Sequence, residues 1–267
     1  MLPSNKTFDI AFFAFNGDQD LVIPGLKNVI RNVPDYQKII LVWDDFVRVR
    51  PVDFEQIQNE INHELTVIKH TDLMPWPAPW PDSIGRWGWI KQQLAKMMCH
   101  TYSDADYTWI CDADVLVTGN PELFVEGKPA LRIDSTKPID LKNGYYDFIT
   151  RYYGITDIHP CTWIGSTCLL DNKIIKEMWE VCQQLNSKSL IECVQEVVEA
   201  KTNRFPFSEF ELYGNYCYNY HKEQFSVVEH NWNYATKSRN PGMPLQIMWN
   251  VFDSDLEIAE KIAYGKQ

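Results

Sequence analysis

Two aspartates, Asp112 and Asp114, follow an apolar run in the stretch YTWICDADVLVTGNPELF (107–124). Because strand side chains alternate between faces, both aspartates are expected to point to one side, with Ala113 pointing back. Like charges so close to an apolar core repel each other unless a cation lies between them. Paired carboxylates favour a hard divalent cation, Mg²⁺ or Mn²⁺, that also holds ligand phosphates. The alternative is a turn that only ends the strand, and the short motif alone does not decide.

The elements that would position these aspartates follow from hydrophobic spacing. Apolar runs at 8–15, 38–43 and 65–70 predict strands, and helical spacing at 26–33 and 54–65 predicts the helices between them. Alternation of strand and helix is typical of a mainly parallel sheet flanked by helices, an α/β Rossmann-like unit. Ligands of such sheets bind at the carboxyl ends of the strands, so the polar residues that follow each strand should converge there.

Beyond a Pro- and Trp-rich loop at 75–89, one helix has an apolar face on Ile90, Leu94, Met97 and Met98 and a polar neighbouring face. Further strands are expected at 129–134, 162–170 and 225–230. Further helices are expected around Ile175–Cys182, Leu190–Val197 and 205–216, with a short acidic helix at the end of the chain. We expect one domain over 1–267, with a nucleotide-binding half (1–118) and a donor-sugar and acceptor half (119–267).

Composition narrows the classes of partner. The net charge of -11 makes nucleic acid an unlikely ligand, because phosphate backbones are bound through basic surfaces. Seven cysteines without a Cys-x-x-Cys pair indicate reduced thiols and a cytoplasmic location. The sequence contains no apolar run of the roughly 18 residues that a membrane span needs, and the first residues lack a signal-peptide core.

Three blocks in order, GWIKQQLAKM (88–97), the Asp-x-Asp strand and FSEFELYGNY (207–216), resemble a group of small bacterial and viral glycosyltransferases of the GT-A fold. The resemblance extends from about Phe8 to Trp232, and its most specific part is the last block. It implies a single mixed, mainly parallel sheet and a soluble enzyme in a bacterial or host cytosol. The implied activity is transfer of a hexose or pentose from a UDP- or GDP-sugar to a glycan or other hydroxyl acceptor.

The resemblance also implies metal and catalytic residues. Asp114 would be a direct ligand of Mn²⁺ or Mg²⁺, and Asp112 would contact the metal, the ribose or both. His230 would be the third protein ligand, although a lone histidine is more often structural. An inverting enzyme also needs a general base, and Glu209 and Glu211, two positions apart on a helix, cannot both face the cleft. We expect Glu209 to be the base because it follows Ser208 at a plausible helix start; the alternative is that both glutamates only favour the helix N-terminus. The sequence does not distinguish inversion from retention.

The remaining candidates line the expected ligand path. Nucleotide contacts are expected from strand ends and from the helix before the aspartates: Phe15, Asn16, Asp44, Asp45, Arg86 and Lys96. Sugar or acceptor contacts are expected from this helix, from the stretch WIGSTCLL and from the last block: Trp89, Gln92, Gly165, Ser166, Glu211 and Tyr213. Each also has a structural interpretation, such as loop solvation for the aspartates, a glycine bulge for Gly165 or a solvated charge for Lys96.

Two other functions compete. A haloacid-dehalogenase-like, Mg²⁺-dependent phosphatase also uses Asp-x-Asp after a strand, but its motif normally lies near the N-terminus and has Thr or Val where this chain has Leu116. A non-catalytic glycan-binding protein would use the 10 Trp, 13 Tyr and 13 Phe to stack on sugars, but it would leave the paired aspartates unexplained.

Overall fold

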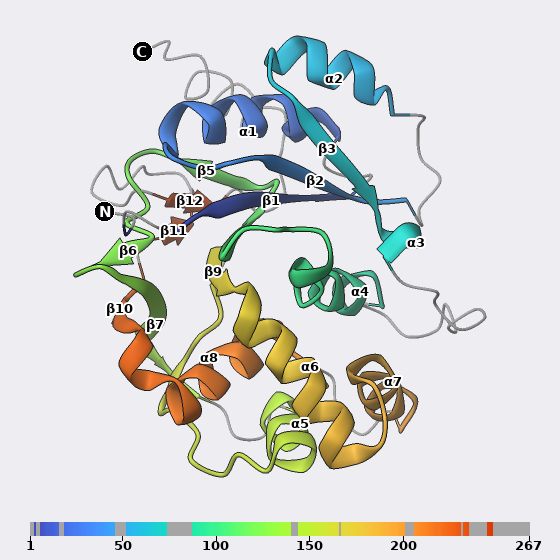
Figure 1. Cartoon of the computed structure of the whole chain (residues 1–267), viewed down its shortest axis with the longest axis vertical. Coiled ribbons are helices and arrows are strands. Elements are labelled where there is room, and N and C mark those ends of the chain that lie inside the picture. Colours follow the sequence, from blue (N-terminus) through green and yellow to red (C-terminus); the bar gives the residue numbers. More distant parts are fainter. Residues whose placement is uncertain are drawn as a thin grey trace.

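The computed structural model describes most of the chain, and the remaining residues are left aside (Figure 1). The described residues are 3, 6–15, 19–45, 52–73, 87–139, 144–165, 167–200, 206–230, 232–234 and 245–247.

A five-stranded sheet lies at the centre of the fold, in the order β3-β2-β1-β4-β9 (Figure 1). The first four strands along the chain run parallel to one another, and β9 is antiparallel to β4. This confirms the predicted α/β class with a mainly parallel sheet. The bounds are β1 (Phe8–Phe15), β2 (Ile39–Asp44), β3 (Leu65–Lys69), β4 (Tyr107–Asp112) and β9 (Thr167–Asp171).

Both faces of this sheet are covered, which explains why its strands are continuous apolar runs. On β1, Ile10 and Phe12 belong to one buried cluster, with the apolar side chains of α1 (Gln19–Asn32) and α2 (Phe54–Ile61). The alternate residues Ala11 and Phe13 belong to the cluster on the opposite face. The central sheet is therefore the middle layer of three.

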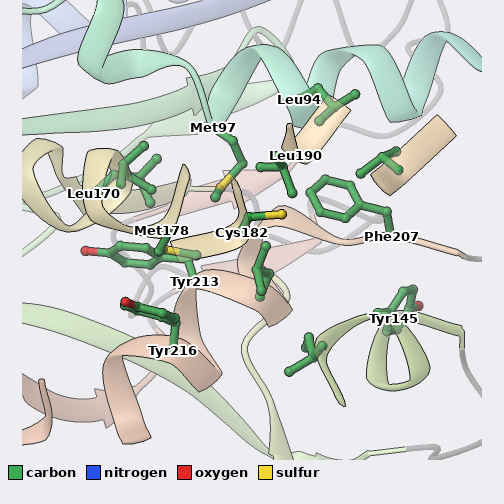
Figure 2. Close-up of a cluster of buried hydrophobic side chains, with 14 of the residues drawn as sticks. Leu94, Met97, Tyr145, Leu170, Met178, Cys182, Leu190, Phe207, Tyr213 and Tyr216 are labelled. Atoms are coloured by element: carbon green, nitrogen blue, oxygen red, sulfur yellow. The ribbon is translucent and has the colours of Figure 1, made fainter. Parts of the chain in front are cut away.

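The buried cluster on the second face is formed largely by helices, which lie on that side of the sheet in Figure 1. Figure 2 shows part of this core, where Leu94, Met178, Leu190 and Tyr213 from four helices, and Met97 directly after the first of them, lie near Leu170 of β9. This packing fixes the helices of the second half of the chain against the helix that precedes the aspartate strand. The helices are α4 (Trp87–Lys96), α5 (Gly144–Tyr153), α6 (Asn172–Asn186), α7 (Leu190–Ala200) and α8 (Glu209–Tyr220).

Two small sheets accompany the central one, where the sequence predicted a single sheet. In one, β7 lies between β6 and β10 and also pairs with β8; in the other, β12 lies between β5 and β11. Both bring distant segments beside the end of β4. Their strands are β5 (Val115–Val117), β6 (Phe124–Val125), β7 (Lys128–Pro138), β8 (Cys161–Thr162), β10 (Ser226–Glu229), β11 (Trp232–Tyr234) and β12 (Leu245–Ile247).

Other boundaries differ from the sequence-based expectations. The strand expected over 162–170 is two strands, β8 and β9, separated at 163–165. Helix α5, with the sequence GYYDFITRYY, was not predicted, although its exposed residues Asp147, Thr150 and Arg151 have helical spacing. The expected final acidic helix and most of the loop at 75–89 lie outside the described residues. The short elements are α3 (His70–Leu73), η2 (Cys99–Thr101) and η3 (Lys222–Gln224).

No helix in the described part of the chain has both the length and the apolar character needed to span a membrane.

Helix α8 packs so closely on the segment after β8 that one glycine is required. A Cβ added at Gly214 would lie 2.2 Å from Cγ of Trp163, whose ring is buried. We therefore predict that Gly214→Ala destabilises the fold by about 1–3 kcal/mol, although alanine is the better helix former. Urea denaturation measures this. The control is Gly88→Ala, where a Cβ meets nothing within 4 Å and unfolding should need as much urea as in the wild type or slightly more. Equal midpoints for the two variants would contradict the packing argument.

Candidate functional site

The carboxyl ends of three parallel strands meet at one edge of the central sheet. Phe15 is in register with Asp44 on one side of β1, and Phe13 is in register with Asp112 on the other. Asp44 and Asp112 therefore flank the end of β1, as the strand pattern predicted. The side chain of Phe15 and all of Asn16 lie outside the described residues, as do Arg86 and Ser166.

A buried ammonium group joins two carboxylates at this edge. Nζ of Lys96 lies 2.9 Å from Oδ1 and 3.0 Å from Oδ2 of Asp112, and 3.2 Å from Oε1 of Glu209. The same Nζ is 5.1 Å from the ring centroid of Phe210. The side chains of Lys96 and Glu209 are 4% and 5% exposed, whereas that of Asp112 keeps 23% of its surface. The structure thus assembles a charge triad, Lys96–Asp112–Glu209, that opens to solvent on the Asp112 side.

Each residue of the triad lies at the end or the beginning of a secondary-structure element. Lys96 is the last residue of α4, and Asp112 is the last residue of β4. Helix α8 begins at Glu209 because the side chain of Ser208 caps it, accepting a hydrogen bond from the N–H of Glu211. The predicted helix start is confirmed. Gln93 of α4 accepts the backbone N–H of Glu209 at 3.1 Å and so holds the two helix ends together.

The electrostatics of the triad keep the lysine charged. Burial lowers the pKa of Lys96, but the adjacent Asp112 and Glu209 carboxylates outweigh it and leave the pKa above its usual value. Burial raises the pKa of the Glu209 carboxyl, which Lys96 partly offsets and Asp112 increases. The site therefore contains a fixed positive charge beside a carboxyl group with increased proton affinity.

Asp114 does not continue the strand. Residues 113–114 form a turn between β4 and β5, and Asp114 is half-buried there. The N–H of Ala113 donates to the carbonyl of Phe13 at 2.8 Å, so the turn begins directly beside the end of β1. Gln92, on α4, donates a hydrogen bond from its Nε2 to Oδ1 of Asp112 at 3.4 Å. Trp89 is half-buried on the same helix.

Glu211 and Tyr213, expected to contact sugar or acceptor, are both fully buried. The Glu211 carboxylate accepts hydrogen bonds from the Thr162 hydroxyl and from the Trp163 N–H, and the Tyr213 hydroxyl accepts the N–H of Asp171 at 2.8 Å. These contacts position the segment between β8 and β9. The two glutamates point to different partners, as expected for positions two apart on a helix.

His230 follows β10 and lies beside β7. Its N–H donates to the carbonyl of Ile133 at 2.8 Å, and its Nδ1 is 3.7 Å from Oδ1 of the buried Asp134. Within the described residues, no group of three or more His, Cys, Asp or Glu side chains is arranged to hold a metal ion. A role for His230 as third metal ligand stays a prediction.

Sequence reasoning missed a buried histidine beside Asp44, at the carboxyl end of β2. His70, expected as the end of a strand, begins α3; it is 1% exposed, and within the described part of the chain neither ring nitrogen has a hydrogen-bond partner. Its Nδ1 lies 3.9 Å from Oδ1 of Asp44, and burial lowers its pKa. Asp45 accepts hydrogen bonds from Thr71 of the same helix. The position of His70 directly after β3 was the only sequence signal for it.

A cavity lies beside the triad, between β9 and β7. It has an empty volume of about 550 Å³ including the space at its mouth, and it is lined by Gly165, Phe210, Arg132 and His230 among others. Gly165 was expected near a sugar, whereas Arg132 was not recognised from the sequence. Phe210 is shared by the cavity and the triad.

Comparisons with known proteins rest on structure. No family model matches the sequence, and no curated protein matches it. The galactosyltransferase LgtC, in complex with donor and acceptor sugar analogs, is 13% identical with a TM-score of 0.53 and 96% and 95% of the two chains covered. An active-site mutant of LgtC aligns with a TM-score of 0.55 at the same identity and coverage.

The glycosyltransferase GlyE of Streptococcus pneumoniae aligns with a TM-score of 0.51 at 13% identity. The alignment covers 96% of this chain and 60% of GlyE, so GlyE is the longer protein. These similarities show a shared fold.

The buried Glu211 predicts a pH-dependent stability. Burial raises the pKa of its carboxyl to about 7, from an ordinary value of 4.5. The folded chain then holds a proton that the unfolded chain has released, so this group's contribution to stability falls as the pH rises from about 4.5 to about 7. Between pH 4.5 and 7.5 the wild type should lose on the order of 1–3 kcal/mol more than Glu211→Gln in urea denaturation. The exposed Glu223→Gln is the control, and parallel pH profiles for wild type and Glu211→Gln would refute the assignment.

Proposed function

We propose that this chain, which has the fold of the GT-A glycosyltransferases, transfers a sugar from a nucleoside-diphosphate sugar to a glycan or other hydroxyl acceptor. The observation that carries the proposal is the Lys96–Asp112–Glu209 triad at the carboxyl edge of the sheet. Transfer breaks the bond between sugar and diphosphate, so negative charge grows on the leaving phosphate. A preorganised positive charge at this edge lowers the free energy of such a transition state.

Lys96 is suited to this task because it needs no rearrangement. Its ammonium group is held by two carboxylates and lies over the Phe13 and Phe210 rings, 5.7 Å and 5.1 Å from their centroids. A charge fixed in a largely apolar environment acts on a nearby phosphate more strongly than one in water. Its position beside Asp112 also places it where the donor sugar and diphosphate would meet the metal.

The donor set fits a divalent cation in part. Asp112 and Asp114 supply hard oxygen ligands, and Asp112 keeps exposed surface although Lys96 contacts both of its oxygens. A carboxylate offers about four lone-pair sites, so binding to Lys96 leaves coordination capacity. We propose that these two residues hold Mn²⁺ or Mg²⁺, with phosphate oxygens and water completing the shell. When bound, the ion would neutralise charge on the leaving diphosphate.

Glu209 is proposed as the residue that accepts the proton of the acceptor hydroxyl. Lys96 contacts Oε1 of Glu209, which fixes the carboxylate while burial raises its pKa toward the working range of a general base. Asp112 also contacts Lys96 and would hold this lysine in place beside Glu209. Glu211 is a weaker candidate for this role, because its carboxylate is held by hydrogen bonds from Thr162 and Trp163 and not by Lys96.

The nucleotide would lie over the ends of β1 and β2. Asp44 is the last residue of β2, and Asp45 follows it beside α3. The ring nitrogens of His70, next to Asp44, have no hydrogen-bond partner among the described residues and could each serve a polar group of the base or ribose. UDP and GDP are the nucleotides we propose, with Phe15, Asn16 and Arg86 as further contacts.

Asp114→Asn tests metal-dependent donor binding. The substitution keeps the size of the side chain and removes the charge that holds a hard cation. With UDP or GDP and Mn²⁺ at about 100 times Kd, the wild type should be stabilised by about 2.7 kcal/mol, and Asp114→Asn should lose most of this. The exposed Asp157→Asn is the control. Unchanged Mn²⁺-dependent nucleotide affinity in Asp114→Asn would remove the pair from metal binding. Stabilisation by a phosphomonoester alone would favour a phosphatase, and stabilisation by glycans alone a binding protein.

Glu209→Gln separates chemistry from binding. The variant keeps an oxygen for Lys96 but cannot accept a proton, so transfer should fall by roughly two to four orders of magnitude with donor affinity nearly unchanged. Glu211→Gln, assayed at a pH where it is folded, should change the rate little. Measuring product formation and its anomeric configuration together checks the assignment. Full activity of Glu209→Gln would exclude this residue from the mechanism.

A further inference from the structure

The cavity between β7 and β9 has an unusual charge for this chain. The sequence contains 36 Asp and Glu against 25 Lys and Arg, yet among the described residues that line this cavity none is acidic. Its ionisable lining is basic or weakly acidic: Arg132, His230, Cys168 and Tyr213. In a protein of net charge -11, a cavity wall with a guanidinium and no carboxylate attracts an anion that the rest of the molecule repels.

Arg132 has no carboxylate partner among the described residues. Its Nη1 donates to the carbonyl of Glu229 at 2.9 Å, and its Nη2 donates to the carbonyls of Pro121 and Glu122 at 2.8 and 2.9 Å. Three carbonyl oxygens satisfy hydrogen-bond donors but do not neutralise the charge. The group is partly desolvated, which lowers its pKa, with the Glu122 charge opposing this effect. A guanidinium in this state gains from an oxyanion that enters the cavity.

A second donor lines the same cavity. Trp163 is 5% exposed, and its indole N–H has no hydrogen-bond partner among the described residues. A buried N–H without a partner costs free energy that a ligand oxygen would recover. The Thr167 hydroxyl is also part of the lining. Aromatic and aliphatic side chains make up most of the remaining wall, which suits the apolar face of a sugar ring.

The cavity adjoins the transfer site. Phe210 lines it and also lies 5.1 Å from Nζ of Lys96, and the next residue back along α8 is Glu209. The empty volume of about 550 Å³ includes open space at the mouth, so a sugar-sized ligand would occupy the mouth as well as the cavity. A ligand there would lie next to Phe210, the neighbour of Glu209 on α8.

We propose that this cavity binds the acceptor, and that the acceptor carries an oxyanion, a phosphate or a carboxylate, which Arg132 recognises together with the Trp163 N–H. The inference rests on the proposed transferase function and specifies its acceptor class. A neutral glycan would leave the Arg132 charge uncompensated. Phosphate and carboxylate share this chemistry, and the experiment distinguishes them.

Binding of matched sugars to the whole chain tests the proposal by calorimetry. We expect glucose 6-phosphate or glucuronate to bind at least tenfold more tightly than glucose, and whichever is tighter identifies the anion. Arg132→Gln should remove the preference for the anion, and Arg132→Lys should restore part of it. Equal affinity for glucose and both anions would overturn the proposal. Binding of inorganic phosphate as tightly as glucose 6-phosphate would reduce the cavity to a simple anion site and overturn the acceptor assignment.

Arg132 also supports the turn at Pro121 and Glu122, so a second set of variants avoids its contacts. Ile164 lines the cavity and is 37% exposed. Ile164→Glu should weaken binding of the anionic sugar at least threefold, Ile164→Lys should strengthen it, and Ile164→Gln should lie between them, with glucose unaffected. Equal anion affinity in all three would refute the cavity as the site.

Nucleotide binding measured on the same proteins separates this inference from the proposed function. Mn²⁺-dependent UDP or GDP binding without any anion preference would overturn the acceptor inference alone. An Arg132-dependent anion preference without nucleotide binding or transfer would overturn the transferase function and, with it, the assignment of the anion as an acceptor.

Discussion

The contact of one lysine with two carboxylates is the interaction on which the candidate site depends. Lys96 ends α4, Asp112 ends β4 and Glu209 begins α8, so a single ammonium group joins the helix before the aspartate strand, the strand itself and the second half of the chain. Without this cation, two carboxylates would lie close together at an apolar edge and repel each other. The sequence raised the question of repulsion between Asp112 and Asp114, and in the structure a protein cation contacts the first of these two carboxylates.

A buried ion pair of this kind is a weak source of net stability, because desolvation of the charges offsets most of their attraction. Removing one partner is nevertheless costly, because it leaves an uncompensated buried charge. The triad therefore mainly determines how the elements are arranged, because its ion pairs require α4 and α8 to contact each other at the end of β4. The hydrogen bond from the Glu209 N–H to Gln93 supports the same contact. The apolar core in Figure 2 supplies the stabilisation that holds the helices in this arrangement.

The same reasoning explains the contrast between two cations near the site, the buried Lys96 and the half-buried Arg132. Lys96 is held by two protein carboxylates, which fix its ammonium group in place. Arg132 meets only carbonyl oxygens in the described part of the chain, so its charge is available to a ligand. Phe210 lies between the triad and the cavity. A donor held beside Lys96 and an anionic acceptor held by Arg132 would then approach each other at Glu209.

The sequence by itself determined the fold class and the edge of the sheet where chemistry is possible. Apolar runs and helical spacing are local properties of a sequence. The runs around Ile10, Leu41 and Trp109 therefore identified buried parallel strands, and the polar residues after them identified the edge of the sheet where the candidate site lies. The helix start at Ser208 was equally local, because its cap depends on residues three positions apart. The motifs also singled out Asp112, Lys96 and Glu209 separately.

Only the tertiary structure decided which of these side chains meet. Pairing of Lys96 with Glu209 spans more than a hundred residues, and no periodicity encodes which buried glutamate faces the lysine. Glu211, two positions further on, is turned to Thr162 and Trp163 instead. Arg132 looked like an ordinary strand residue, because its carbonyl partners and the cavity that it lines are assembled from segments far apart in the sequence. Charge compensation depends on distance in space, and this distance is set by packing.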